Sequence, residues 1–270
     1  MLLGAIKLCA QTDEKIQIDL FRQPLFILQL EWVKLDQATI GRLTRIDAMW
    51  AQSMAIETIE RCKVSHGLKE VNKMADQKTI DAYNGQVNTY LKMVDELGVD
   101  PILLRFIDRL KVNDYVLDLG CGPALASAAM RRKGLRVDPV DAAKAMVQLA
   151  NDKFDIAARQ AQFSDIDATN TYHGVWANFS LLHAQPQHLA AILMALHKAL
   201  RPKGFLHLGM KLGQGSKRDK YDRYYAYYSQ AELEHYLENA GFSIVHSELG
   251  EALGMAGDME PWVVLTGSAK

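Results

Sequence analysis

Hydrophobic and polar positions follow two different patterns along the chain, and the change falls near residue 74. From there onward, short apolar runs of strand length alternate with segments in which apolar residues recur every three or four positions. Continuous apolar strands that alternate with amphipathic helices are typical of a mainly parallel sheet covered by helices on both faces. We therefore predict an α/β domain over residues 74–270.

The predicted elements of this domain follow in a regular order. A helical region within 74–100 precedes the first strand. Strands are predicted at 116–119, 136–140, 156–161, 174–179, 205–210, 242–247 and 262–266, and helices at 124–133, 142–151, 189–200 and 229–240. Gly134 and Gly241 end two helices, and Ser229 with Glu232 forms a capping box that begins the last one. The last two strands have no long helix between them.

The first 73 residues have a different pattern. Residues 1–35 show weak periodicity, whereas apolar residues recur at helical spacing from Ile40 to Cys62 without a proline. We predict a helical extension over residues 1–73. Three interpretations stay open: a remnant of a gene fusion, a reading frame extended upstream of a natural start at Met74, or a helical extension that packs on the sheet domain.

Composition and charge narrow the class of function. The 270 residues are 49% hydrophobic and 23% charged, which is usual for a globular protein. The formal net charge of −1 gives no overall attraction to nucleic acid or to anionic membranes, and no apolar run approaches the roughly 20 residues of a membrane helix. We expect neither a membrane nor a nucleic-acid partner.

Three cysteines, Cys9, Cys62 and Cys121, are widely spaced and odd in number. They exclude a disulfide scaffold and a four-cysteine zinc site, and they fit a reducing, cytoplasmic compartment. We therefore predict a cytoplasmic protein without a metal site.

The strongest candidate for chemistry is the turn after the first strand, Asp118-Leu119-Gly120-Cys121-Gly122. Its glycines permit a tight turn and a close approach of a ligand, and the helix that follows directs free N–H groups toward it. Leu125 occupies the third-glycine position of the dinucleotide fingerprint, and no Lys-Ser/Thr pair follows as in a P-loop. Cys121 has no basic partner in the sequence, so we interpret it as a small filler of the turn.

The segment from Asp118 to Gly122 resembles the first motif of class I S-adenosylmethionine (SAM) dependent methyltransferases, with Ala124 where a glycine is usual. A second run, Tyr172 to His183, contains Tyr-His-Gly-Val-Trp-Ala and then Ser-Leu-Leu-His, and it resembles small bacterial enzymes of the TehB-like type. The resemblance covers about residues 74–270. It implies a Rossmann-like, seven-stranded, mostly parallel sheet whose last strand inserts antiparallel beside the fifth, and it implies SAM as the cofactor.

Asp141 ends the second strand, 21 residues after Gly120. A carboxylate there can accept both hydroxyl groups of a ribose, because its two oxygens match a vicinal diol. Helix capping is the alternative, and both roles can hold together. The resemblance extends to the second family motif, which implies that Asp141, Ala142 and Met146 contact the nucleoside, the methionine near the adenine.

The resemblance implies the remaining cofactor contacts. They are Gln162 and Phe163 at the adenine, Asn178 and Phe179 beside the transferred methyl group, and Tyr83 and Tyr90 over the methionine end. Asp165 rivals Gln162, and ordinary helix packing is the alternative for both tyrosines. His183 is a base or a structural residue, so no catalytic residue is assigned. The polar segment 211–228 is expected to cover the acceptor.

These observations predict a SAM-dependent methyltransferase that acts on a small-molecule acceptor. A dinucleotide-dependent oxidoreductase is a second hypothesis, which Leu125 opposes. The third is a non-catalytic SAM-binding or RNA-polymerase-associated regulator, because residues 36–66 faintly resemble the helical segment of DksA/TraR-type proteins, without their zinc finger. The acceptor and the oligomeric state are not predicted.

Overall fold

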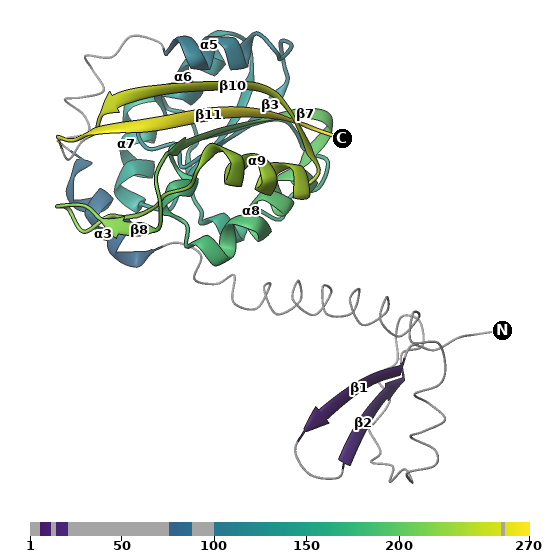
Figure 1. Cartoon of the computed structure of the whole chain (residues 1–270). Coiled ribbons are helices and arrows are strands. Elements are labelled where there is room, and N and C mark those ends of the chain that lie inside the picture. The colour runs from purple at the N-terminus through teal and green to yellow at the C-terminus, as the bar shows by residue number, and fades with distance from the viewer. Residues whose placement is uncertain (1–5, 12–14, 21–75, 88–99, 255–256) are drawn as a thin grey trace. The chain divides into compact units, whose positions relative to one another are not determined.

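The computed structural model describes residues 6–11, 15–20, 76–87, 100–254 and 257–270. The chain divides into two compact units, Met1–Lys63 and Val64–Lys270. In the first unit, β1 (Ile6–Gln11) and β2 (Lys15–Leu20) pair antiparallel (Figure 1). The prediction of a helical extension is therefore wrong for these residues. Apolar and polar residues alternate along β2 with the strand period of two, which is the signal that was missed.

Residues 21–73, with the helix predicted from Ile40 to Cys62 and the DksA/TraR-like segment, lie outside the described residues. The domain boundary predicted between residues 73 and 74 lies ten residues after the end of the first compact unit. The three interpretations of residues 1–73 given above stay predictions.

The described residues of the second unit form a seven-stranded sheet with the strand order β10-β11-β7-β6-β3-β4-β5 (Figure 1). The five strands β3 to β7 run parallel, and β11 lies antiparallel between β7 and β10. This confirms the predicted mostly parallel sheet with an antiparallel last strand. The bounds are β3 Tyr115–Leu119, β4 Arg136–Asp141, β5 Arg159–Gln160, β6 Tyr172–Asn178, β7 Leu200–Lys211, β10 Phe242–Leu253 and β11 Met259–Ala269.

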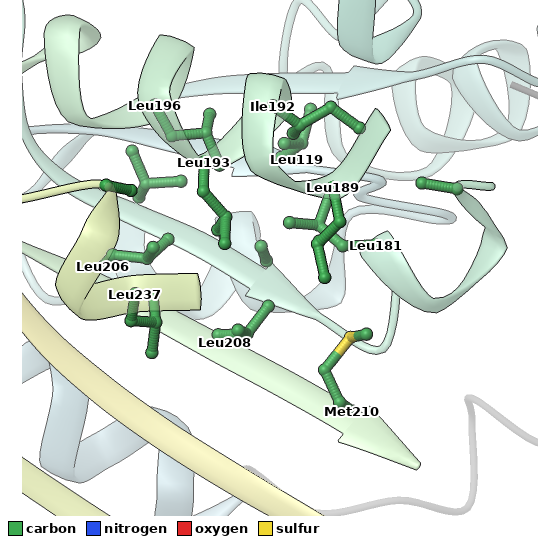
Figure 2. Packing of buried hydrophobic residues seen from close by; sticks show 14 of the residues in the cluster. Leu119, Leu181, Leu189, Ile192, Leu193, Leu196, Leu206, Leu208, Met210 and Leu237 are labelled. Atoms are coloured by element: carbon green, nitrogen blue, oxygen red, sulfur yellow. The ribbon is translucent and has the colours of Figure 1, made fainter. Parts of the chain in front are cut away.

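Helices cover both faces of the sheet. They are α3 (Gln77–Gly85), α5 (Pro101–Ile107), α6 (Leu125–Arg132), α7 (Lys144–Phe154), α8 (Pro186–Ala199) and α9 (Gln230–Asn239). Side chains alternate along β3, so Leu117 packs with α8 and α9, whereas Val116 packs with α5 and α6. Figure 2 shows the leucines of α8 against Leu206 and Leu208 of β7. No helix of the described residues is long and apolar enough to cross a membrane.

Three elements differ from the prediction, and one of them is α5, which begins just after the predicted helical region ends at residue 100. The third strand is shorter than 156–161, because the Asn151 side chain bonds both the N–H and the C=O of Ala158 (2.7 and 2.9 Å) in place of a strand partner. The polar segment 211–228 contains a short antiparallel pair, β8 (Ser216–Arg218) and β9 (Tyr224–Ala226). The capping box of Ser229 and Glu232 forms as predicted.

Candidate active site

The glycine turn joins β3 to α6 at the carboxyl end of the sheet. Gly120 and Gly122 have φ angles of 75° and 52°, in the left-handed region that favours glycine. The N–H groups of Gly120 and Cys121 both donate to the C=O of Val140 at 2.9 Å, which ties the turn to β4. A Cβ atom on Gly120 would lie 2.4 Å from the Cβ of Ser180, so no larger residue fits without a shift.

Asp141 connects the turns that follow β3 and β4. Its carboxylate accepts hydrogen bonds from the N–H groups of Gly122 and Ala143, each at 2.8 Å. Burial raises the pKa of Asp141, and these backbone hydrogen bonds oppose the rise. Each oxygen of the Asp141 carboxylate accepts one of these two hydrogen bonds and keeps a lone pair for a ligand in the cavity that Asp141 lines.

A cavity of about 300 Å³, called the main cavity here, lies at the carboxyl ends of β3, β4, β5 and β6. This volume falls in the range of small-ligand sites. Eight of the residues predicted from the sequence line it, namely Tyr83, Gly120, Asp141, Ala142, Gln162, Phe163, Asn178 and Phe179. The main cavity therefore brings together side chains from α3 and from four loops.

Asp118, Cys121, Gly122 and Met146, the other predicted residues that the structure describes, do not line the main cavity. Asp118 is buried and accepts a hydrogen bond from the Ser127 hydroxyl at 2.7 Å. Burial raises the pKa of Asp118 to about 7; the Ser127 bond opposes this and the nearby Asp141 adds to it. Gly122 contributes through its N–H to Asp141.

Cys121 and Met146 are buried behind the main cavity. Burial strongly raises the pKa of the Cys121 thiol, which fits the interpretation of a filler and not of a nucleophile. Met146 packs against Ile80 and Ala143, two residues of the cavity wall. Tyr90 lies outside the described residues.

Sequence reasoning missed several wall residues of the main cavity, among them Asp76, Thr79, Ile80 and Ser180. Ser180 is 6% exposed, and its hydroxyl has no hydrogen-bond partner in the part of the chain that the structure describes. Ser180 is the first residue of the Ser-Leu-Leu-His run, and this run was the sequence signal that could have identified it. A buried hydroxyl on a cavity wall without a partner points to a ligand that supplies one.

The segment with β8 and β9 holds α3 over the main cavity. Arg218 donates to both carboxylate oxygens of Asp76, at 2.7 and 2.9 Å, and the N–H of Tyr224 donates to the Thr79 hydroxyl at 2.8 Å. Burial disfavours the charged form of Asp76, but the hydrogen bonds from Arg218 and Thr79 outweigh it and lower the pKa to about 2. This ion pair is therefore formed at neutral pH.

Tyr83 and His183 meet at one end of the main cavity. The Tyr83 hydroxyl lies 2.8 Å from Nε2 of His183, and Nδ1 of His183 lies 2.6 Å from the C=O of Tyr224. A carbonyl can only accept, so Nδ1 carries the proton and Nε2 accepts the Tyr83 O–H. Burial lowers the pKa of His183 to about 4, with Arg223 and Lys211 adding to this, so the ring is neutral at neutral pH.

A second cavity of about 220 Å³, called the side cavity here, adjoins the main one. Both cavities are lined by Tyr83, Phe179 and His183. The side cavity is otherwise lined by Leu182, Lys211, Arg223, Tyr225, Ala252, Leu253, Gly254, Glu260 and Trp262. Its two cations have carboxylate partners, because Lys211 is paired with Glu260, and Arg223 with Asp219.

Asn178 ends β6 at the main cavity, and Phe179, the next residue, lines both cavities. Phe179 has a φ of 54°, a strained conformation for an aromatic residue, and its N–H donates to the C=O of Gly209 at 3.0 Å. The Oδ1 of Asn178 lies 3.0 Å from Nε2 of His207, whose ring stacks on Trp176. Burial lowers the pKa of His207 to about 3, so a neutral histidine holds the Asn178 amide in place.

The comparisons with known proteins agree with this geometry. A family model described as a methyltransferase domain matches residues 90–247, more than half of the chain. A SAM-dependent methyltransferase of Methanosarcina mazei is 18% identical with a TM-score of 0.55, over 64% of this chain and 99% of its own. A TehB-like methyltransferase of Corynebacterium glutamicum is 16% identical with a TM-score of 0.54, over 70% of this chain and 100% of its own. No curated protein matches the chain.

The chain therefore belongs to the methyltransferase domain family, and it is a class I SAM-dependent methyltransferase. Its cofactor is SAM. The main cavity fits such a group. Asp141 offers a carboxylate, the turn at Gly120 has no room for a side chain, and the Ser180 hydroxyl has no hydrogen-bond partner among the described residues. The comparisons support neither the regulator hypothesis nor the DksA/TraR resemblance.

Proposed function

We propose that the protein transfers the methyl group of SAM to a small-molecule acceptor held in the side cavity. The observation that carries this proposal is the pair of adjoining cavities with a shared wall of Tyr83, Phe179 and His183. A volume of about 220 Å³ suits a ring-sized molecule and is small for a segment of protein or nucleic acid. The two reactants would then meet at the shared wall.

The order of the strands supports an orientation for the donor. The order β5-β4-β3-β6 places Gln162 and Phe163 at one end, Asp141 and the glycine turn in the middle, and Asn178 at the other end. We place the adenine at the first end, the ribose hydroxyls on Asp141, and the methyl group near Phe179. This orientation directs the methyl group toward the side cavity.

Bound SAM supplies a methyl group that positive sulfur already activates. The residues of this chain then need to align the acceptor in line with the carbon–sulfur bond and to exclude water. Phe179 and Tyr83 lie at the shared wall, and the pair of Arg218 and Asp76 ties the segment with β8 and β9 to the start of α3, the helix that carries Tyr83. The residues that enclose the two reactants thus come from loops at the end of the sheet and from α3.

A neighbour of the same fold supports a small acceptor. It is a 1,6-didemethyltoxoflavin-N1-methyltransferase of Burkholderia thailandensis with 1,6-didemethyltoxoflavin and S-adenosylhomocysteine bound. It is 17% identical with a TM-score of 0.50, over 98% of this chain and 99% of its own. At this identity only the fold is shared, so the acceptor of our protein has to be found by experiment.

The first test is calorimetric titration of the protein with SAM. We expect binding in the wild type and a loss of about 100-fold or more in Asp141→Ala, because hydrogen bonds to a charged group contribute about 1.5–3 kcal/mol each. Glu251→Ala, an exposed carboxylate on β10, is the control and should bind as the wild type does. Unchanged affinity in a folded Asp141→Ala variant contradicts the ribose role, and no binding to the wild type contradicts the proposal.

The second test identifies the acceptor. Pools of small molecules are incubated with the protein and SAM labelled at the methyl group, and the label is followed by mass spectrometry. Transfer to a small molecule supports the proposal. Transfer only to added protein or RNA overturns the assignment of the side cavity.

A further inference from the structure

We infer that Tyr83 and His183 form a proton-accepting pair at the shared wall, and that the side cavity takes an uncharged aromatic acceptor that loses a ring-bound O–H or N–H proton as it is methylated. The inference rests on the proposed function. It assigns a role to two residues for which the sequence left a structural alternative open.

The position of the pair is the first argument. Tyr83 and His183 line both cavities, so a nucleophile that reaches from the side cavity toward the donor passes the Tyr83 hydroxyl. That hydroxyl donates to Nε2 of His183 at 2.8 Å, and Nδ1 is held by the C=O of Tyr224 at 2.6 Å. The direction of proton movement is therefore set by the tautomer: from Tyr83 to His183.

The charges around the pair are the second argument. His183 is faced by Tyr83 from α3, by Lys211 from β7, and by Arg223 and Tyr225 from the segment with β8 and β9. Nη1 of Arg223 lies 3.4 Å from the Tyr83 hydroxyl, close enough to stabilise negative charge on that oxygen. Asp219 binds the same guanidinium at 2.5 Å and keeps the surroundings neutral. Lys211 and Arg223 disfavour a positive charge on His183, so the ring is neutral before the reaction and accepts a proton only as the sulfur loses its own positive charge.

The proton and electron balance closes within the two cavities. The acceptor O–H or N–H gives its proton to the Tyr83 oxygen while the Tyr83 proton passes to Nε2 of His183. The lone pair of the acceptor forms the bond to the methyl carbon, and the electrons of the breaking carbon–sulfur bond stay on sulfur. Sulfur loses its positive charge as His183 gains one, so the net charge of the buried site is unchanged. The proton leaves to water when the products dissociate.

The walls of the side cavity indicate the class of acceptor. Tyr83, Phe179, Tyr225 and Trp262 line it with their aromatic rings, and the ammonium group of Lys211, which pairs with Glu260, lies over the Tyr225 ring. An anionic acceptor would have to break that ion pair, whereas an uncharged ring leaves it intact. A cavity of about 150 Å³ already admits benzene, so about 220 Å³ suits a substituted single ring or a small bicycle.

The experiment measures initial rates with labelled SAM and a panel of uncharged phenols and azoles of graded acidity. Wild type, Tyr83→Phe and His183→Gln are compared, with Tyr236→Phe on α9 as the control. We expect Tyr83→Phe to lose about 100-fold or more of kcat with weakly acidic phenols, the usual contribution of a positioned base. The loss should shrink with 4-nitrophenol, because its more acidic O–H gives up its proton during transfer with less help from a base. Tyr236→Phe should match the wild type.

His183→Gln separates proton transfer from mere positioning. Glutamine can still accept the Tyr83 hydroxyl but cannot take its proton, so a base role predicts a loss similar to that in Tyr83→Phe. In both variants the rate with each acceptor should follow the ionisation of that acceptor with pH, which the wild-type rate should not do. A glutamine variant with wild-type rates overturns the inference.

Two further outcomes separate this inference from the proposed function. SAM binding with methylation of aliphatic thiols or amines only, and of no phenol or azole, overturns the inference and leaves the proposed function standing. Absence of SAM binding in the wild type contradicts the proposed function, and the inference falls with it.

Discussion

The two cavities share a wall but are built in different ways. The main cavity collects the turns that leave neighbouring parallel strands, and most of its lining residues have short side chains or, at Gly120, none. The side cavity collects large side chains from α3, β7, β11 and the segment with β8 and β9. From this difference we expect that binding of the donor depends mainly on the geometry of the turns, whereas the choice of acceptor depends on large side chains.

The forces that hold the two cavities differ accordingly. In the main cavity, hydrogen bonds from the glycine turn to Val140 and Asp141 fix this turn to the end of β4. In the side cavity, an ion pair joins Lys211 of β7 to Glu260 of β11, and beside the main cavity another joins Arg218 of β8 to Asp76. Removal of one partner from a partly buried ion pair is destabilising, because it leaves the other charge without a partner. Such pairs therefore hold the segment with β8 and β9 in place. Four substitutions test this contrast.

Gly120→Ala should have the largest effect, because it changes the backbone of the main cavity. The new Cβ atom meets Ser180 at 2.4 Å and the φ of 75° strains any residue with a side chain. We expect a loss of about 3 kcal/mol or more of unfolding free energy, and loss of SAM binding. Chemical denaturation and calorimetry measure the two effects. Gly85→Ala, where a Cβ atom has open space, is the control. Equal unfolding free energies and equal SAM binding in the two variants would contradict the role of the glycine turn in stability and in SAM binding.

Asp118→Asn tests a group behind the main cavity through pH. The folded pKa is about 7 against about 3.8 unfolded, so between these pH values the folded state keeps a proton that the unfolded state has lost. Raising the pH through this window therefore lowers the stability of the wild type. The variant should be about 4 kcal/mol more stable at pH 8 and should have a shallower pH dependence. Asp141, whose pKa burial also raises, keeps part of the slope. Chemical denaturation of the wild type and of Asp118→Asn at pH 5 and pH 8 measures this difference. An equal change of unfolding free energy with pH in the two proteins would contradict the prediction.

Trp262→Ala tests the side cavity. Trp262 lines the side cavity and makes an edge contact with Phe179 at 6.4 Å between ring centres. Removal of an aromatic wall should raise the KM for the acceptor about tenfold and leave the SAM affinity unchanged. Steady-state kinetics with the identified acceptor provides the measurement, and Leu249→Ala, exposed on β10, serves as the control. A matching loss of SAM affinity would erase the distinction between the cavities.

Ala124→Gly should have the smallest effect. Ala124 has a φ of 60°, so glycine would relieve about 1 kcal/mol of strain, but its buried methyl group contributes about 0.8 kcal/mol. The two effects nearly cancel, and we expect unfolding free energy and SAM affinity close to those of the wild type. A stability change well beyond 1 kcal/mol in denaturation experiments would show that one of these contributions has been misjudged.

Local sequence signals predicted most of the fold. The strand and helix periods, the glycine helix ends and the capping box of Ser229 each act within a few residues. The missed elements depend on other contacts: the third strand is shortened by the Asn151 side chain, and β8 pairs with β9 inside a polar segment. The pair β1 and β2 was missed because its period-two pattern is short.

By itself, the sequence determined the α/β order, the glycine turn and the placement of Asp141 at the next strand end, because consecutive parallel strands bring their carboxyl ends to the same edge. The contact of Tyr83 with His183 spans 100 positions, and that of Arg223 with Tyr83 spans 140. Only the tertiary structure decided these, because no periodicity specifies which segments outside the sheet meet. It also decided that Asp118 and Cys121 lie behind the main cavity, since burial depends on the packing of the whole domain.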